Sequence, residues 1–200
     1  MRLKISLIEI SSEVIPHHLN ESDDDISTVS HLLVEALTKG MPSEVVDIDE
    51  GKVFMASLLS SRLIEGIPYN LDPSRWGGKY YSGDVSATIG ETLTYAFLEE
   101  KFDVKFTDIV PLRQVKYLGY SPDALVDAGK SPTLLTYLGG KGFLFINARG
   151  SFRWSQNWLT RNLVRDLIQV EKIRYPDNYG LLSYVYRDEG WNLAGVVIRP

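Results

Sequence analysis

Residues 84–200 switch repeatedly between helical and extended patterns, and the order of these switches restricts the fold more than any other feature of the sequence. Apolar residues recur every three to four positions in some segments and every second position in others. The expected elements are a helix over residues 86–102, strands over 106–117, 123–128 and 143–149, a helix over 156–174, and strands over 181–186 and 191–198. This order predicts an α/β (α+β) fold in which helices flank a central mixed sheet.

The first 83 residues contain further elements of both kinds. The expected elements are a strand over residues 1–10 and helices over 26–37 and 52–65. Residues 66–84 are rich in Gly, Pro, Ser, Asn and Asp, which is typical of a long connecting segment. We therefore expect residues 1–83 to form an N-terminal α/β extension, packed on a core of residues 84–200 in one compact unit.

The composition excludes several classes of site. The 200 residues include no cysteine, which excludes disulfide frameworks, thiolate zinc sites, iron–sulfur clusters and cysteine nucleophiles. None of the three histidines lies after His31, so a Ser-His-Asp hydrolase is disfavoured. The sequence shows no signal peptide, and no apolar run approaches the roughly 18 residues of a membrane span. We expect a cytoplasmic protein without a membrane partner.

Charge is distributed unevenly along the chain. Residues 1–100 contain 7 basic and 17 acidic residues, whereas residues 101–200 contain 14 basic and 9 acidic ones. Seven basic residues and two acidic ones lie between Lys141 and Arg174. Such a stretch can bind a polyanion such as nucleic acid, although the net charge of the whole chain is −5. A solvated helix face explains the same charges equally well.

Carboxylates occupy positions where a core would favour apolar residues. Glu91 falls on the same side of its helix as Tyr95 and Leu98, which indicates a partly buried carboxylate. A role in complementing the helix dipole explains Glu91 equally well. Asp123 and Asp127 share one face of their expected strand, although Ser-Pro-Asp is also a common turn opening. Each carboxylate therefore has a functional and a structural interpretation.

The strand expected over residues 143–149 becomes polar only at its end. Phe143 and Phe145 are followed on the same face by Asn147 and Arg149. Functional side chains often lie where a regular element ends. For this strand considered alone, a simple exit of the polar residues into solvent is the favoured interpretation.

Taken together, these elements resemble the PD-(D/E)XK nuclease superfamily, whose members have a restriction-endonuclease-like αβββαβ core. The resemblance covers residues 84–200 and rests on Gly90-Glu91, Pro122-Asp123 and Asn147-Ala148-Arg149, in that order. In the family, an acid on the first helix, the Asp of the Pro-Asp motif and the acid of an acid-x-Lys strand hold Mg²⁺. The resemblance implies a metal-dependent nuclease that cleaves phosphodiester bonds in DNA and, as in many enzymes of the family, forms a homodimer.

The third motif departs from the family pattern at both of its polar positions. Asn147 stands where the family has Glu or Asp, and Arg149 stands where it has Lys. An amide oxygen can coordinate a hard cation but brings no charge, so Mg²⁺ should be held more weakly. Arginine stays protonated, so Arg149 can bind a phosphate or stabilise developing charge but cannot act as a base.

The resemblance and the basic stretch together define three groups of site residues. The catalytic group is Glu91, Asp123, Asn147 and Arg149. The ligands of one or two Mg²⁺ (or Mn²⁺) ions are Glu91, Asp123, Asp127, Asn147 and the carbonyl of Ala148. The nucleic-acid-binding group, which would contact backbone phosphates, is Arg153, Trp154, Arg161 and Arg165.

Two functional hypotheses remain open on the sequence. The first is a divergent metal-dependent nuclease acting on DNA. The second is a nuclease-fold protein that has lost its chemistry and binds nucleic acid or a protein partner. Divalent-metal binding that depends on Asp123 distinguishes the first hypothesis from the second.

Overall fold

The structure is a computed structural model that describes residues 1–15, 24–38, 43–60, 82–112, 122–172 and 178–200. Parts of three expected elements lie outside the described residues, namely residues 61–65, 113–117 and 173–174. The connecting segment expected over residues 66–84 also lies almost entirely outside them.

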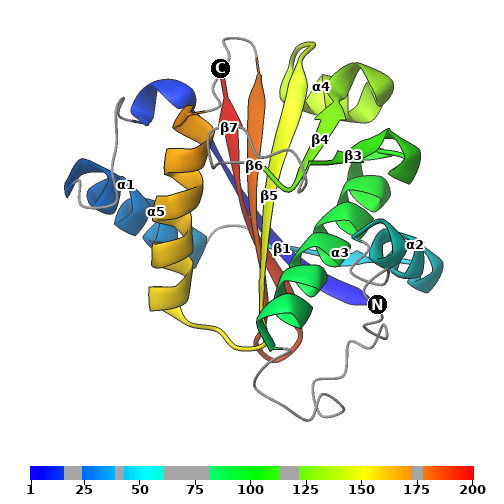
Figure 1. The fold of residues 1–200 in the computed structure, drawn as a ribbon, viewed down its shortest axis with the longest axis horizontal. Helices are drawn as coiled ribbons and strands as arrows, with labels where there is room; N and C mark the ends of the chain where they lie inside the picture. The colour runs from blue at the N-terminus through cyan, green and yellow to red at the C-terminus, as the bar shows by residue number, and fades with distance from the viewer. Residues whose placement is uncertain (16–23, 39–42, 61–81, 113–121, 173–177) are drawn as a thin grey trace.

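Seven strands form one mixed sheet at the centre of the molecule (Figure 1). In chain order the strands are β1 (Arg2–Ser11), β2 (Glu44–Asp47), β3 (Ile109–Pro111), β4 (Ala124–Asp127), β5 (Phe143–Ser151), β6 (Tyr179–Arg187) and β7 (Trp191–Arg199). Across the sheet the order is β2-β1-β7-β6-β5-β4-β3. The β5–β6 and β7–β1 pairs are parallel, and the other pairs are antiparallel.

Helices cover both faces of this sheet, so the expected α/β layering is confirmed. The helices are α1 (Asp24–Thr38), α2 (Glu50–Ser60), α3 (Ser82–Phe102), α4 (Pro132–Leu138) and α5 (Gln156–Lys172). One hydrophobic core lies between the sheet and α2, α3 and α4, and a second lies between the sheet and α1 and α5 (Figure 1). Burial of an apolar face on each side of the sheet is the main force that holds these layers together.

The central strands β6 and β7 supply side chains to both cores. Most residues of these strands are buried, as expected for strands that helices cover on both sides. Along β6, Leu181 and Val185 belong to the core on the α3 side, whereas Leu182 and Tyr184 belong to the core on the α5 side. The alternation of side chains along one strand thus links the two cores.

Two short elements were not predicted from the sequence. β2 is a four-residue edge strand that is largely exposed, so it carries no pattern of buried residues. α4 has only seven residues, which is too short for a helical repeat to be recognised. Its ends nevertheless carry capping signals: the Ser131 hydroxyl accepts a hydrogen bond from the Leu134 amide at 3.1 Å, and Gly139 ends the helix with φ of 81°.

From residue 82 to residue 187 the elements follow the order α3, β3, β4, β5, α5, β6, with α4 between β4 and β5. The N-terminal part of the chain joins the same sheet. β1 pairs with β7 in parallel from Leu3 opposite Trp191 to Ser11 opposite Arg199. Residues on both sides of the expected boundary between 83 and 84 therefore share one sheet.

α3 approaches β5 closely where two glycines meet. A Cβ atom on Gly150 would lie 1.8 Å from the carbonyl oxygen of Ser86, and a Cβ atom on Gly90 would lie 2.4 Å from the carbonyl carbon of Arg149. The obstructing atoms belong to the backbone, so no side-chain rotation can relieve these overlaps. The two glycines therefore set the distance between α3 and the sheet, and with it the position of Glu91 on α3.

Gly150→Ala is expected to destabilise the protein by about 1–3 kcal/mol or more, because the added methyl group forces α3 and β5 apart. Urea unfolding followed by circular dichroism would show this as a lower transition midpoint. Gly129→Ala is a matched control, since its added carbon would lie 3.1 Å from the flexible carboxylate of Asp127. The control should change stability by no more than about 0.5 kcal/mol. Equal midpoints for the two variants would contradict this account of the contact.

Candidate functional site

Asp123 directly precedes β4 and makes hydrogen bonds to β5 where a further residue of β4 would otherwise pair. Its amide donates a hydrogen bond to the carbonyl of Ile146 at 2.8 Å, and its carboxylate Oδ2 accepts one from the amide of Ala148 at 2.7 Å. β4 starts at Ala124, which pairs with Ile146, so β5 continues beyond the end of its neighbour. The carboxylate therefore satisfies a backbone donor that the shorter strand leaves open.

Asn147 and Arg149 project from β5 toward α5. Leu144, Ile146 and Ala148 belong to the core on the α3 side, so the alternate residues of β5 face the opposite side of the sheet. There the Asn147 side-chain amide donates a hydrogen bond to Oε1 of Gln169 on α5 at 3.0 Å. The expectation that Asn147 and Arg149 share one face of their strand is confirmed.

Arg149 forms an ion pair with a fully buried carboxylate on α5. Its Nη2 donates to Oδ1 of Asp166 at 2.6 Å, and its Nε lies 3.2 Å from Oδ1 and 3.3 Å from Oδ2. The Tyr184 hydroxyl, from β6, donates to Oδ2 of Asp166 at 3.1 Å. We call Arg149, Asp166 and Tyr184 the arginine–aspartate–tyrosine network. It joins β5, α5 and β6 through one carboxylate.

Burial and charge act in opposite directions within this network. Burial raises the pKa of the Asp166 carboxyl, and the hydrogen bonds and charge of Arg149 oppose that rise. Burial alone would lower the pKa of Arg149, but its hydrogen bond with Asp166 raises it above the ordinary value for arginine. Burial also raises the pKa of the Tyr184 hydroxyl, which stays a hydrogen-bond donor. The buried aspartate is thus compensated by an arginine and a neutral phenol.

The side of α3 that carries Glu91 and Tyr95 is buried. Glu91 is 1% exposed, which confirms the expected burial of this carboxylate, and Tyr95 is fully buried one turn later. Burial and the negative charge of Asp123 raise the pKa of the Tyr95 hydroxyl. Within the described ranges no hydrogen-bond partner reaches this hydroxyl. This side of α3 therefore faces the core between α3 and the sheet.

The five predicted metal ligands do not gather at one place. Asp123 and Ala148 are in contact, but Asp127 lies four residues further along the chain, about 13 Å at the rise of an extended strand. Asp127 instead accepts a hydrogen bond from the amide of Gly129 at 2.9 Å. Asn147 faces α5 and contacts Gln169. In the parts of the chain that the structure describes, no three His, Cys, Asp or Glu residues group closely enough to hold a metal ion. Of the predicted ligands, Asp123 and Ala148 are thus brought together, whereas Asp127 and Asn147 make contacts elsewhere.

The predicted nucleic-acid-binding residues lie on α5 and on the segment before it. Arg153, Arg161 and Arg165 are exposed. Arg165 also interacts electrostatically with Asp166. Trp154 is half-buried and packs against Tyr186, with their ring centroids 4.8 Å apart and tilted by 46°. Three exposed cations and one partly accessible indole thus lie on α5 and on the segment that precedes it.

Four polar residues of the site were not assigned to it from the sequence: Tyr95, Asp166, Gln169 and Tyr184. One sequence signal existed for Asp166. The apolar stripe of α5 includes Leu159, Leu163 and Leu167, all fully buried, and Asp166 falls three residues after Leu163 on the same side. A charged residue at a core position of an amphipathic helix requires a buried partner.

Comparisons with protein-family models, with curated proteins and with solved structures found no match to this chain. Among the described helices, none has both the length and the apolar character needed to cross a membrane.

Asp166→Asn is expected to lower the free energy of unfolding by about 3 kcal/mol, because it leaves the Arg149 charge without its partner. Tyr184→Phe should cost less, about 1.5 kcal/mol, since it removes one hydrogen bond to a charged group. Urea unfolding measures both effects.

The control for this pair of measurements replaces the whole network, as Arg149→Met with Asp166→Leu and Tyr184→Phe. It should regain much of the stability lost in Asp166→Asn, because no unpaired charge and no unpaired hydroxyl remain. A triple variant as unstable as Asp166→Asn would show that the unpaired arginine is not the cause.

Proposed function

We propose that this protein binds nucleic acid through a restriction-endonuclease-like core whose former catalytic strand now serves a structural role. The observation that carries this proposal is the arginine–aspartate–tyrosine network. Arg149, at the position of the family's catalytic lysine, is tied to a buried carboxylate of α5 by both Nε and Nη2. An arginine held in this way anchors α5 to the sheet.

The arrangement of elements supports the nuclease-like core in this proposal. The order α3, β3, β4, β5, α5, β6 is a helix, three strands, a helix and a strand, and β5 and β6 are parallel. α3 and α5 pack on opposite faces of the sheet. Pro122-Asp123 lies at the start of β4, and its carboxylate contacts the backbone of the Asn-Ala-Arg motif on β5. Two of the three motifs therefore meet in space.

The exposed cations support nucleic acid as the partner. Arg161 and Arg165 are one turn apart on α5, and Arg153 lies shortly before the helix, so these guanidinium groups can meet successive phosphates of a polyanion. Contacts of this kind position a nucleic-acid backbone without reading its sequence. Binding through them is expected to fall steeply with salt.

Arg161→Ala and Arg165→Ala are each expected to weaken DNA binding to a similar degree for all sequences. Each should also reduce the slope of log K against log salt by about 1, the loss of roughly one phosphate contact. Fluorescence anisotropy with a labelled oligonucleotide, titrated at several salt concentrations, measures both quantities.

The matched control for these arginines is Lys130→Ala, which removes one exposed charge at the far end of β4. It should leave affinity and salt slope unchanged. Failure of the wild-type protein to bind any nucleic acid at low salt would contradict the proposal and favour a protein partner.

The second candidate function is metal-dependent cleavage of DNA, and Asp123 favours it. This carboxylate lies beside the backbone of Ala148, and its charge acts on the buried Tyr95, which lies one turn from the buried Glu91 on the same helix. Mg²⁺ sites in nucleic-acid enzymes can be built from one or two carboxylates together with water and substrate phosphate. Cleavage would therefore depend on Asp123 rather than on the full predicted ligand set.

We expect no Mg²⁺- or Mn²⁺-dependent cleavage of labelled single- or double-stranded DNA by the wild-type protein, because Asn147 and Arg149 are engaged with α5. The measurement includes Asp123→Asn, which keeps an oxygen to accept the hydrogen bond from Ala148, and Asp127→Asn, purified identically. Wild-type cleavage that is lost in Asp123→Asn and kept in Asp127→Asn would overturn the first proposal in favour of a nuclease.

A further inference from the structure

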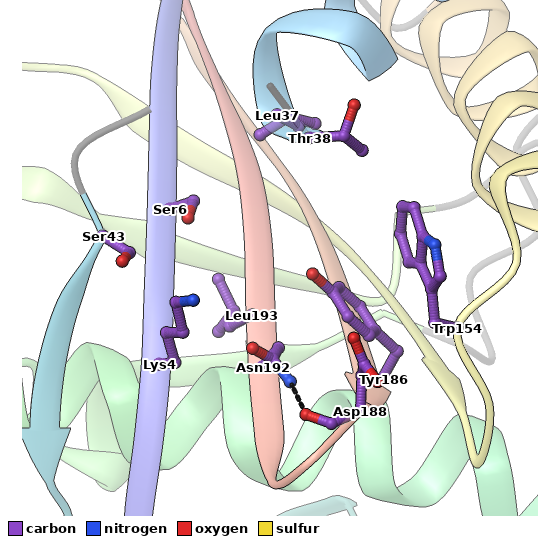
Figure 2. Close-up of a pocket in the computed structure, with 10 residues that line it drawn as sticks. All are labelled: Lys4, Ser6, Leu37, Thr38, Ser43, Trp154, Tyr186, Asp188, Asn192 and Leu193. Carbon is purple, nitrogen blue, oxygen red and sulfur yellow. Dashed lines mark hydrogen bonds between the residues drawn. The ribbon is translucent and has the colours of Figure 1, made fainter. Parts of the chain in front are cut away.

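A polar pocket of about 310 Å³ lies between the sheet, the end of α1 and the segment before α5 (Figure 2). Its lining residues come from three strands, one helix and three connecting segments: Lys4, Ser6, Leu37, Thr38, Ser43, Trp154, Tyr186, Asp188, Asn192 and Leu193. The pocket lies on the α5 side of the sheet, where Tyr186 belongs to the second core. It is distinct from the contact between Asp123 and Ala148.

One wall of the pocket is aromatic. Trp154 and Tyr186 lie side by side, with their ring centroids 4.8 Å apart (Figure 2). The Tyr186 hydroxyl points into the space between Asn192 and Thr38 (Figure 2). Burial and the charge of Asp188 raise the pKa of that hydroxyl, so it is available as a neutral donor. This wall offers a π-surface with a polar tip.

The remaining walls offer hydrogen-bonding groups of both kinds. The Asn192 side-chain amide donates to the carbonyls of Asp188 and Gly190 at 3.0 and 3.1 Å, which fixes its orientation and leaves its oxygen as an acceptor. Ser6 adds a hydroxyl from β1, and Lys4 adds an ammonium group directed toward β7 (Figure 2). The pocket thus combines an aromatic surface, fixed polar groups, the cation of Lys4 and the carboxylate of Asp188.

We infer that this pocket binds a single unpaired nucleotide of a nucleic-acid strand that lies along α5, an inference that rests on the proposed function. A base would stack on Trp154 and Tyr186, Asn192 would accept a hydrogen bond from its edge, and Lys4 would contact a phosphate. Base–aromatic stacking of this kind is the usual means of holding single strands. A volume of about 310 Å³ is at the lower end of ligand pockets and suits one nucleotide.

The position of the pocket connects it to the cationic residues. Trp154 directly follows Arg153. α5 begins two residues after Trp154, at Gln156, and carries Arg161 on its exposed side. A strand whose phosphates contact these arginines would pass the mouth of the pocket. A base that is paired in a duplex cannot leave its stack without an energetic cost, so the pocket confers a preference for single strands.

The test compares the binding of a 12-nucleotide single strand and a duplex of the same length, by fluorescence anisotropy at one low salt concentration. We expect the wild-type protein to bind the single strand about tenfold more tightly than the duplex, because the single strand gains roughly one base stack. Trp154→Leu should remove this preference, so that its affinities for the single strand and the duplex lie within twofold of each other. Trp154→Phe, which keeps an aromatic ring, should retain most of it.

Two further variants separate the pocket from the packing of Trp154. Ser6→Phe fills the pocket from β1 and keeps both Trp154 and Tyr186, and it should remove the single-strand preference as Trp154→Leu does. Phe143→Leu changes an exposed aromatic residue at the other end of β5 and should have no effect. Thermal unfolding of each variant verifies that it is folded.

The outcomes distinguish this inference from the proposed function. Wild-type binding to both DNA forms without a single-strand preference would overturn the pocket assignment and leave nucleic-acid binding in place. Single-strand preference that persists in both Trp154→Leu and Ser6→Phe would overturn it as well. Failure of the wild-type protein to bind either form at low salt would contradict the proposed function itself, and the pocket assignment with it.

Discussion

The buried carboxylate of Asp166 is the interaction on which the arrangement of the α5 side depends. A charged group without solvent contact is costly, and here it is compensated by a two-nitrogen contact from Arg149 and a hydroxyl from Tyr184. Because these partners come from β5 and β6, the same contact determines where α5 lies over the sheet. The cationic residues of α5 and the pocket beside its first turn are positioned as a consequence.

β5 separates two different environments along its length. Its residues on one face pack beneath α3, where Gly90 and Gly150 allow helix and strand to approach without side chains between them. Its residues on the other face, Asn147 and Arg149, make hydrogen bonds to α5. A strand constrained on both faces has little freedom to move, which suits a rigid support for a binding surface.

Most of the regular elements could be predicted from the sequence because their burial patterns are long. The strand expected over residues 106–117 is an exception, because Phe106–Asp108 form a 3-10 helix and β3 begins only at Ile109. The stripe of Leu159, Leu163 and Leu167 indicated an amphipathic helix, and these residues are fully buried in α5. The shared face of Asn147 and Arg149 followed from the period of a strand. Their partners could not be predicted in the same way, because the pairing of β5 with α5 and β6 brings together residues 17 to 35 positions apart. The edge strand β2 was missed since it buries too little to leave a pattern.

The parallel pairing of β1 with β7 also affects how the chain can fold. Leu3 lies opposite Trp191, so this ladder joins segments separated by almost the whole described chain. During synthesis on the ribosome, β1 must wait for β7 before it gains its parallel neighbour, and an unpaired strand edge is prone to wrong pairing. Contacts between such distant segments also slow folding, because loop closure must precede the stabilising contacts. Completion of the sheet is therefore expected to be a late event, and β1 is the strand most in need of protection until then.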